Sequence, residues 1–182
     1  MVEYGTLTSD ELRRKKRIKP LSSVFALTVM RVKTPKVRLG TNITFQNFNT
    51  GTQVSPSFDL SFTTQAGIKN TNFGPYKYDS TIATFMYQGV TIGQVTIPKG
   101  KAGLRSTKKV TVTVNVNSNA LSSTTGLGSE LGAGVLTLNG QAKLSGKVEL
   151  MMFVMKKKKS AEMNCSMTIN LSSKAIQSMI CE

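Results

Sequence analysis

Histidine is absent from this chain, so the candidates for acid–base, nucleophilic or metal-binding chemistry are nine carboxylates and two thiols. Without histidine, the chain lacks the usual general base of serine and cysteine hydrolases and the commonest zinc ligand. The carboxylates show no D-x-D or E-x-x-E spacing, and the one adjacent pair, Asp10 and Glu11, precedes a basic run. The glycine-rich residues 126–134 contain no phosphate-binding motif. We therefore expect no enzyme activity, no catalytic residues, and no metal or cofactor site.

Cys165 and Cys181 are the two thiols of the chain. A disulfide between them would stabilise the fold by roughly 3 kcal/mol in the chain-entropy model of loop closure. Two free thiols, one of them buried, are the alternative that the sequence leaves open. Sequons at Asn42, Asn164 and Asn170 are candidate glycosylation sites. These sites can be glycosylated only if the domain enters the secretory lumen, which also favours disulfides. Glycosylation and the disulfide therefore depend on the same topology.

The chain is strongly basic, with 24 Lys and Arg residues against nine Asp and Glu residues and a formal net charge of +15. This excess predicts attraction to an anionic surface, either a membrane leaflet or nucleic acid. The residues that we expect to contact a membrane form one N-terminal basic run: Arg13, Arg14, Lys15, Lys16, Arg17 and Lys19. A second basic run, residues 156–159, lies nearer the C-terminus.

Two alternatives to membrane contact apply to this charge. The N-terminal run is also typical of a disordered, solvated tail or a nuclear-targeting patch. Specific nucleic-acid binding is not expected, because basic residues do not alternate with exposed aromatic residues as a stacking platform requires. The positive charge alone does not identify the binding partner.

A short apolar segment follows the basic run. Residues 24–30 read Val-Phe-Ala-Leu-Thr-Val-Met, and a basic flank before an apolar run is typical of the cytoplasmic side of a membrane anchor. A spanning helix needs about 20 apolar residues, so this segment is too short to cross a bilayer. We therefore interpret residues 24–34 as the remnant of an anchor or as a first strand, after a disordered basic tail at residues 1–23.

From Lys36 onward, apolar and polar residues alternate with period two, which is typical of half-buried strands. The clearest strand covers residues 108–117, where four valines share one face. Thr81–Tyr87 and Val90–Ile97, joined by Gln88 and Gly89, predict a β-hairpin. Further strands are predicted at residues 147–156 and 163–171, the latter with Cys165 facing inward, and weaker strands at residues 38–48, 57–69 and 134–144. A short helix is expected only within residues 118–131.

This pattern predicts a mainly β fold for residues 35–182. The expected architecture is an antiparallel β-sandwich, immunoglobulin- or fibronectin-III-like, with about seven strands and one short helix. The sequence shows no internal repeat.

Several spacings in residues 69–101 agree with one family pattern. The matching residues are Asn70, Asn72, Phe73, Tyr76, Tyr78, Tyr87, Gly89 and Gly93, followed by the valines of residues 110–116 and by Cys165 and Cys181. In these positions the chain resembles subgroup 2 of the plant late embryogenesis abundant proteins. That subgroup includes the hairpin-induced-like membrane proteins, also called the hydroxyproline-rich glycoprotein family. Within residues 69–101, Gly74 and Pro75 predict a turn between strands, and Tyr76 and Tyr78 alternate as aromatic residues of the strand that follows. The resemblance independently implies a β-sandwich with one short helix.

The resemblance implies a non-catalytic accessory protein of stress or defence responses. We expect it to associate with the plasma membrane or an endomembrane through its basic and apolar N-terminal region, and to act by binding or protecting a membrane or an unidentified protein or lipid partner. The sandwich would be extracytoplasmic if a spanning helix formed. The alternative is a soluble, desiccation-protective protein of the cytosol, since the apolar run is short. The sequence indicates no oligomeric state.

Overall fold

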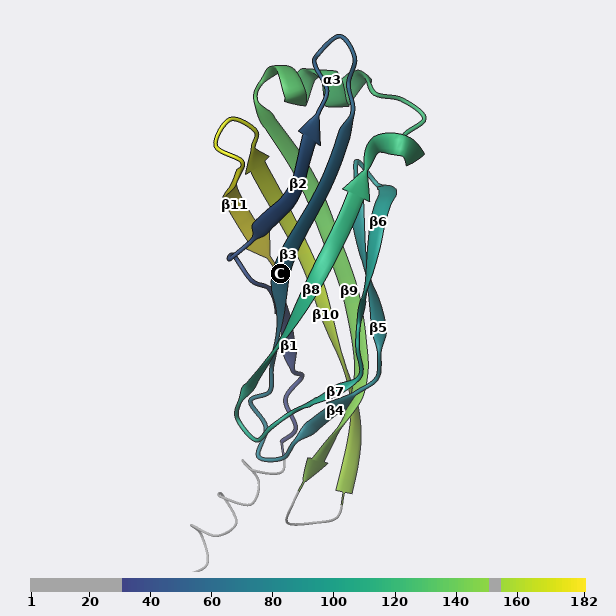
Figure 1. Cartoon of the computed structure of the whole chain (residues 1–182). Helices are drawn as coiled ribbons and strands as arrows, with labels where there is room; N and C mark the ends of the chain where they lie inside the picture. The colour runs from purple at the N-terminus through teal and green to yellow at the C-terminus, as the bar shows by residue number, and fades with distance from the viewer. Residues whose placement is uncertain (1–30, 151–154) are drawn as a thin grey trace, which may run out of the picture. The chain divides into compact units, whose positions relative to one another are not determined.

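Two antiparallel sheets form the part of the chain that the computed structural model describes, residues 31–150 and 155–182 (Figure 1). Thr34–Glu182 form one compact unit. The strands are β1 (Lys36–Leu39), β2 (Thr44–Thr50), β3 (Phe58–Lys69), β4 (Tyr76–Tyr78), β5 (Thr81–Tyr87), β6 (Val90–Ile97), β7 (Gly100–Ala102), β8 (Thr107–Asn117), β9 (Val135–Leu150), β10 (Met155–Asn170) and β11 (Ala175–Cys181). A 3-10 turn, η1 (Ser118–Ala120), and one α-helix, α3 (Thr125–Gly132), connect β8 to β9.

The first sheet is built around β3. Its four strands place β1 and β2 end to end along one edge of β3 and β8 along the other. The second sheet has seven strands in the order β11-β10-β9-β4-β7, and β5 also pairs with β9 and carries β6 on its other edge. The mainly β, sandwich-like antiparallel fold with one α-helix is therefore confirmed, although with eleven strands instead of about seven.

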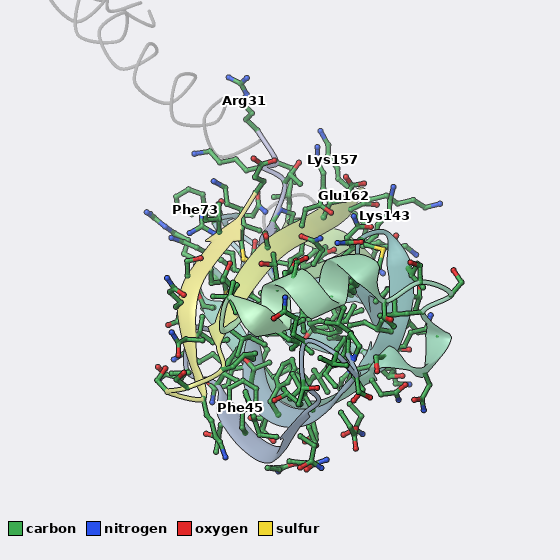
Figure 2. The ribbon with its side chains drawn as sticks, turned by 90° about the horizontal axis from the view of Figure 1, so that it is seen from above. Arg31, Phe45, Phe73, Lys143, Lys157 and Glu162 are labelled. Atoms are coloured by element: carbon green, nitrogen blue, oxygen red, sulfur yellow. A yellow bond between two sulfur atoms is a disulfide. The ribbon has the colours of Figure 1, made fainter. Side chains whose placement is uncertain are left out.

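The core lies between the two sheets because alternate residues of the long strands are apolar and point inward. In β3, Leu60 and Phe62 are fully buried, and Val114 of β8 is buried beside them. In β10, Met163, Cys165, Met167 and Ile169 are buried in the same alternation, so the expected inward position of Cys165 is confirmed. Helix α3 lies across one end of the sandwich (Figures 1 and 2), where it buries Leu127 and Leu131.

The predicted hairpin is confirmed. β5 and β6 pair from Thr81 opposite Ile97 to Tyr87 opposite Val90. The turn residues Gln88 and Gly89 have φ angles of 47° and 84°. Positive φ at both central residues is the geometry of a tight two-residue hairpin turn, whose twist matches that of the flanking strands.

Two strand boundaries differ from the predictions. The strand predicted at residues 147–156 is wrong, because β9 ends at Leu150 and β10 begins at Met155 opposite it. Residues 150–155 are all apolar and include no Gly, Pro or Asn, so the sequence gives no signal of the reversal between these two antiparallel strands. The strand predicted at residues 38–48 is interrupted at residues 40–43, where the Thr64 hydroxyl donates a hydrogen bond to the Gly40 carbonyl at 3.1 Å.

Two strands, β7 and β11, were not predicted from the sequence. β7 has three residues, too few for a periodic pattern to be visible. β11 is an edge strand, and most of its side chains are partly or fully exposed, so its apolar residues do not alternate as those of a core strand do.

Candidate functional site

A groove of about 730 Å³ lies on the outer face of the second sheet, where β4, the end of β9 and the start of β10 meet. β4 and the end of β9 place their small or apolar side chains inward and their charged side chains outward, whereas β10 begins with four successive lysines, residues 156–159. In β4, Tyr76 and Tyr78 are buried and Lys77 between them is exposed. The charged and serine side chains that line the groove are Lys77, Lys147, Lys156, Lys158, Lys159, Asp79, Glu149, Ser145 and Ser160.

Strand register aligns four lysines in one row across this sheet. Lys101 of β7 pairs with Lys77 of β4, Lys77 pairs with Lys147 of β9, and Lys147 pairs with Lys158 of β10. All four side chains are exposed on the same face. Neighbouring strands are about 4.8 Å apart, so each lysine stands directly beside the next. We call Lys101, Lys77, Lys147 and Lys158 the lysine row.

Like charges directly opposite each other destabilise a sheet, and only part of this row is neutralised. Glu149 forms a salt bridge of 3.0 Å with Lys77 and a looser one of 3.9 Å with Lys156. The hydrogen bond from Lys77, together with the nearby lysine charges, holds the pKa of Glu149 below its usual value. Within the described part of the chain, no carboxylate pairs with Lys147 or Lys158.

The next charged pair along this face is neutralised. Lys143 stands opposite Glu162, and their side chains form a salt bridge of 2.8 Å. Figure 2 shows both side chains together on one side of the domain. The Lys–Lys pairing is thus a feature of the groove and does not extend along the whole face.

Tyr76 fixes β4 to the strands that carry the row. Its hydroxyl donates to the backbone carbonyl oxygens of Leu144 and Lys159, at 3.2 and 3.1 Å. The Tyr76 ring occupies the space that a side chain at Gly146 would need. Burial, and to a smaller extent Asp79 and Tyr78, raises the pKa of Tyr76 to about 12.

This raised pKa predicts a loss of stability at alkaline pH. Tyrosine in an unfolded chain ionises near pH 10, so the stabilisation from neutral Tyr76 is complete below pH 10 and disappears as the pH rises towards 12. The expected loss from this residue is about 2 kcal/mol. Urea unfolding between about pH 9 and pH 11.5 measures it. Tyr76→Phe should be less stable at the lower pH but show a flatter pH dependence; parallel curves would contradict the assignment.

Asn70 holds together the two loops at this end of the sandwich. Its side-chain amide donates to the carbonyl oxygens of Gly74 and Gly103, both at 2.8 Å, and its carbonyl accepts from the backbone and side chain of Asn72. Asn70 and Asn72 are both buried. The loop from β3 to β4 is therefore tied to the loop from β7 to β8, and this connection positions β4 and β7 beside the first sheet.

The first sheet is also basic at this end. Lys36 of β1 pairs with Lys69 of β3, and Arg38 lies two residues further along β1 in a row with Gly67 and Lys109. We call this end of the sandwich, opposite α3 in Figure 1, the basic end. It contains every Lys and Arg of Thr34–Glu182 except Lys143 and Lys174, together with two carboxylates, Asp79 and Glu149.

The structure joins the two predicted cysteines and places the three sequon asparagines in different surroundings. Cys165 and Cys181 stand opposite each other on β10 and β11 and are joined in a disulfide, with Cα atoms 4.1 Å apart. Asn42 and Asn164 are exposed. The Asn170 side chain is engaged, since its oxygen accepts hydrogen bonds from the backbone and hydroxyl of Ser173 at 2.9 and 3.1 Å.

The predicted membrane-contact residues, Arg13, Arg14, Lys15, Lys16, Arg17 and Lys19, lie outside the described residues, as does the apolar run at residues 24–30. Among the described residues, no helix has both the length and the apolar character to cross a bilayer. The same part of the chain contains no group of three or more Cys, Asp or Glu side chains arranged to hold a metal ion.

The groove was not predicted from the sequence. Residues 156–159 form a visible basic run, but the other lysines of the groove are isolated in the sequence. Only the pairing of β4 with β7 and β9 brings them into one row. A pattern of single lysines at outward positions of successive strands was the one available signal, and it has no meaning until the register is known.

Comparison with known proteins places the chain in a family. The family described as Late embryogenesis abundant protein matches residues 65–167. A late embryogenesis abundant protein of Arabidopsis thaliana is 27% identical over 164 residues, which are 89% of this chain and 74% of that protein.

Solved structures give weaker likenesses. The solution structure of a protein assigned to the late embryogenesis abundant group covers 99% of this chain and 94% of its own, with 14% identity and a TM-score of 0.35. A crystal structure of a protein from Archaeoglobus fulgidus covers 72% and 94%, with 12% identity and a TM-score of 0.33. Likeness at such TM-scores carries no argument, whereas the family match spans more than half of the chain. The chain belongs to the late embryogenesis abundant protein family.

Proposed function

We propose that this protein is a non-catalytic accessory protein that attaches to anionic membrane surfaces through its basic end. Membership of the family supports a protein related to stress and desiccation, and relatives in the family are in general non-enzymatic. Attachment to a membrane goes beyond family membership. The observation that supports it is the uneven distribution of charge over the domain.

The charge is concentrated where it can act on one surface. Lysines of both sheets meet at the basic end, while Asp59 and Glu130 belong to the opposite end, at the start of β3 and in α3. A domain polarised in this way is oriented by a negative leaflet as it approaches, with the cations towards the headgroups. Each basic residue near such a surface contributes about 1 kcal/mol.

Two exposed apolar side chains lie at the same end. Phe73 and Leu104, in the two loops joined by Asn70, are 42% and 49% exposed. The Arg105 guanidinium lies 5.0 Å from the centre of the Phe73 ring. An aromatic and an aliphatic side chain beside cations suit the boundary between lipid headgroups and acyl chains.

The N-terminal region supports the same function. Its basic run and the apolar residues that follow it would add to the attraction exerted by the basic end. The resemblance to the hairpin-induced-like members also favours a site at the plasma membrane or an endomembrane and a role in defence. Under an extracytoplasmic placement of the sandwich, the exposed Asn42 and Asn164 are better glycosylation sites than the hydrogen-bonded Asn170.

Vesicle flotation of the full chain tests this function. We expect binding to vesicles of phosphatidylcholine and phosphatidylserine, no binding to phosphatidylcholine alone, and release at about 1 M salt, where charges are screened beyond about 3 Å. Lys36→Gln with Lys147→Gln removes one cation from each sheet at the basic end. This double variant should bind roughly 30-fold more weakly, at about 1 kcal/mol per residue.

The matched control removes two cations elsewhere. Lys143→Gln with Lys174→Gln should reduce binding much less, because these residues lie away from the basic end. Equal losses in both double variants would contradict attachment through the basic end. Absence of binding to any vesicle would exclude membrane attachment and favour the desiccation-protective role in solution.

A further inference from the structure

We propose that the groove beside the lysine row is a binding site for a ligand that carries two or more phosphate groups close together, such as a polyphosphorylated inositol ring. If the ligand is a lipid headgroup, this inference rests on the proposed function and specifies which class of headgroup the protein recognises. A free inositol polyphosphate has the same chemistry. Vesicle binding distinguishes the lipid from the free ligand.

The groove holds more positive charge than its own carboxylates balance. Five lysines and two carboxylates line it, which leaves a net charge of +3. Glu149 is already shared between Lys77 and Lys156. Lys147 and Lys158 therefore face the groove as adjacent ammonium groups without a carboxylate partner in the described part of the chain.

The in-register lysines oppose the stability of the sheet, which suggests a function for them. Lys77, Lys147 and Lys158 occupy three successive strands at one height, where like charges repel. The same two strands carry a neutral alternative a few residues away, the pair of Lys143 and Glu162. An anion seated between the lysines would turn this repulsion into attraction.

The geometry suits clustered phosphates. Lysines on neighbouring strands start about 4.8 Å apart, and their flexible four-carbon side chains allow several ammonium groups to converge on one phosphate or spread over adjacent ones. Ser145 and Ser160 stand opposite each other one step along the same face, with their hydroxyl oxygens 3.4 Å apart. These hydroxyls can donate to phosphate oxygens or to ring hydroxyls.

The size and lining of the groove select against other anions. Its volume of about 730 Å³ is that of a site for a small molecule. Its one aromatic lining residue, Tyr78, is buried, so the groove offers no exposed ring on which a nucleotide base could stack. A compact polyphosphate without a base fits these features best.

Binding of inositol hexakisphosphate to the full chain at physiological salt provides the first test. Lys147→Gln with Lys158→Gln should weaken binding at least tenfold. Lys36→Gln with Lys109→Gln removes the same charge from the same end, on the first sheet, and should change binding less than threefold. Equal losses in the two double variants would overturn the proposal, because attraction would then follow net charge and not the groove.

Two vesicle preparations of equal total charge, one with phosphatidylinositol 4,5-bisphosphate and one with phosphatidylserine, separate the sources of the ligand. The unchanged chain should prefer the bisphosphate vesicles, and the groove variant should lose that preference. Binding of inositol hexakisphosphate without binding to either vesicle would support a free ligand and contradict the proposed membrane attachment. Binding to both vesicles without preference, with equal losses in both double variants, would leave membrane attachment intact and overturn the groove as a site.

Lysine acetylation read by mass spectrometry gives a test that needs no variant. With inositol hexakisphosphate present, Lys147 and Lys158 should become protected relative to Lys36 and Lys109. Uniform protection of all four would contradict a site in the groove. Thermal unfolding of the variants checks their fold, and removal of Lys147 and Lys158 should leave stability unchanged or raise it, because their mutual repulsion is lost.

Discussion

Replacement of Asn70 by alanine is expected to lower the free energy of unfolding by about 3 kcal/mol, or roughly 10 °C in Tm. The change removes the donor to the carbonyl oxygens of Gly74 and Gly103 and the acceptor for Asn72. These groups are buried or partly buried, so water replaces the lost hydrogen bonds poorly. Each group left without a partner costs about 1–3 kcal/mol.

Two further variants isolate the hydrogen bonds from the volume of the side chain. Asn70→Asp keeps the shape and the acceptor oxygen but turns the donor into an oxygen that faces two carbonyl groups, so it should be at least as unstable as Asn70→Ala. Asn119→Ala alters an exposed asparagine and should change Tm very little. Urea and thermal unfolding measure all three. A stable Asn70→Asp variant would contradict the hydrogen-bonding role.

The Asn70 variants also connect stability with the candidate site. Asn70 holds the loop that leads into β4, and β4 carries Lys77 at the centre of the lysine row. Local loosening of this end should therefore weaken phosphate and vesicle binding under conditions where the rest of the domain stays folded. Hydrogen exchange of the β4 and β7 amides would show whether the loosening is confined to that end.

Reduction of the disulfide is the second change with a large expected effect, a loss of about 3 kcal/mol. Cys165 and Cys181 close the open end of the β10–β11 hairpin, far from its turn at residues 171–174. β11 is an edge strand that pairs only with β10 among the described strands. Without the disulfide, backbone pairing alone retains the C-terminal end of β11, and its amides should exchange faster.

Thermal unfolding with and without a thiol reductant measures the effect on the unchanged chain. Cys181→Ala keeps Cys165 in the core and should reproduce the reduced protein, with no further response to the reductant. An unchanged Tm on reduction would contradict a stabilising role. Because cytosolic thiols are kept reduced, the redox state of the pair in protein taken from its native compartment also reports where the domain resides.

Local patterns were sufficient for the elements that depend on neighbouring residues. The β5–β6 hairpin follows from two alternating runs around Gln88 and Gly89, and β8 follows from valines at every second position. The glycines and polar residues before β9 limited the helix to a short one, as α3 is. These elements were predictable because side-chain alternation and turn geometry are set within a few residues.

The sequence patterns failed at the connection between β9 and β10. Residues 148, 150, 152 and 154 are apolar, but so is every residue from 150 to 155. Because no polar residue interrupts that run, one strand was predicted where β9 and β10 are two antiparallel strands. β11 lacks a clear pattern because an edge strand need not bury a full face. Pairing with β10, and not local preference, decides this strand.

The sequence by itself determined the fold class, the high positive charge, the two cysteines and the turn residues. Only the tertiary structure decided which lysines act together. Lys77, Lys101, Lys147 and Lys158 are far apart in the chain, and the pairing of four strands sets them side by side. The same holds for Asn70, whose partners at Gly74 and Gly103 lie in two different loops. Cross-strand register depends on long-range packing of the whole sandwich, since a slip of one residue would turn each side chain to the other face.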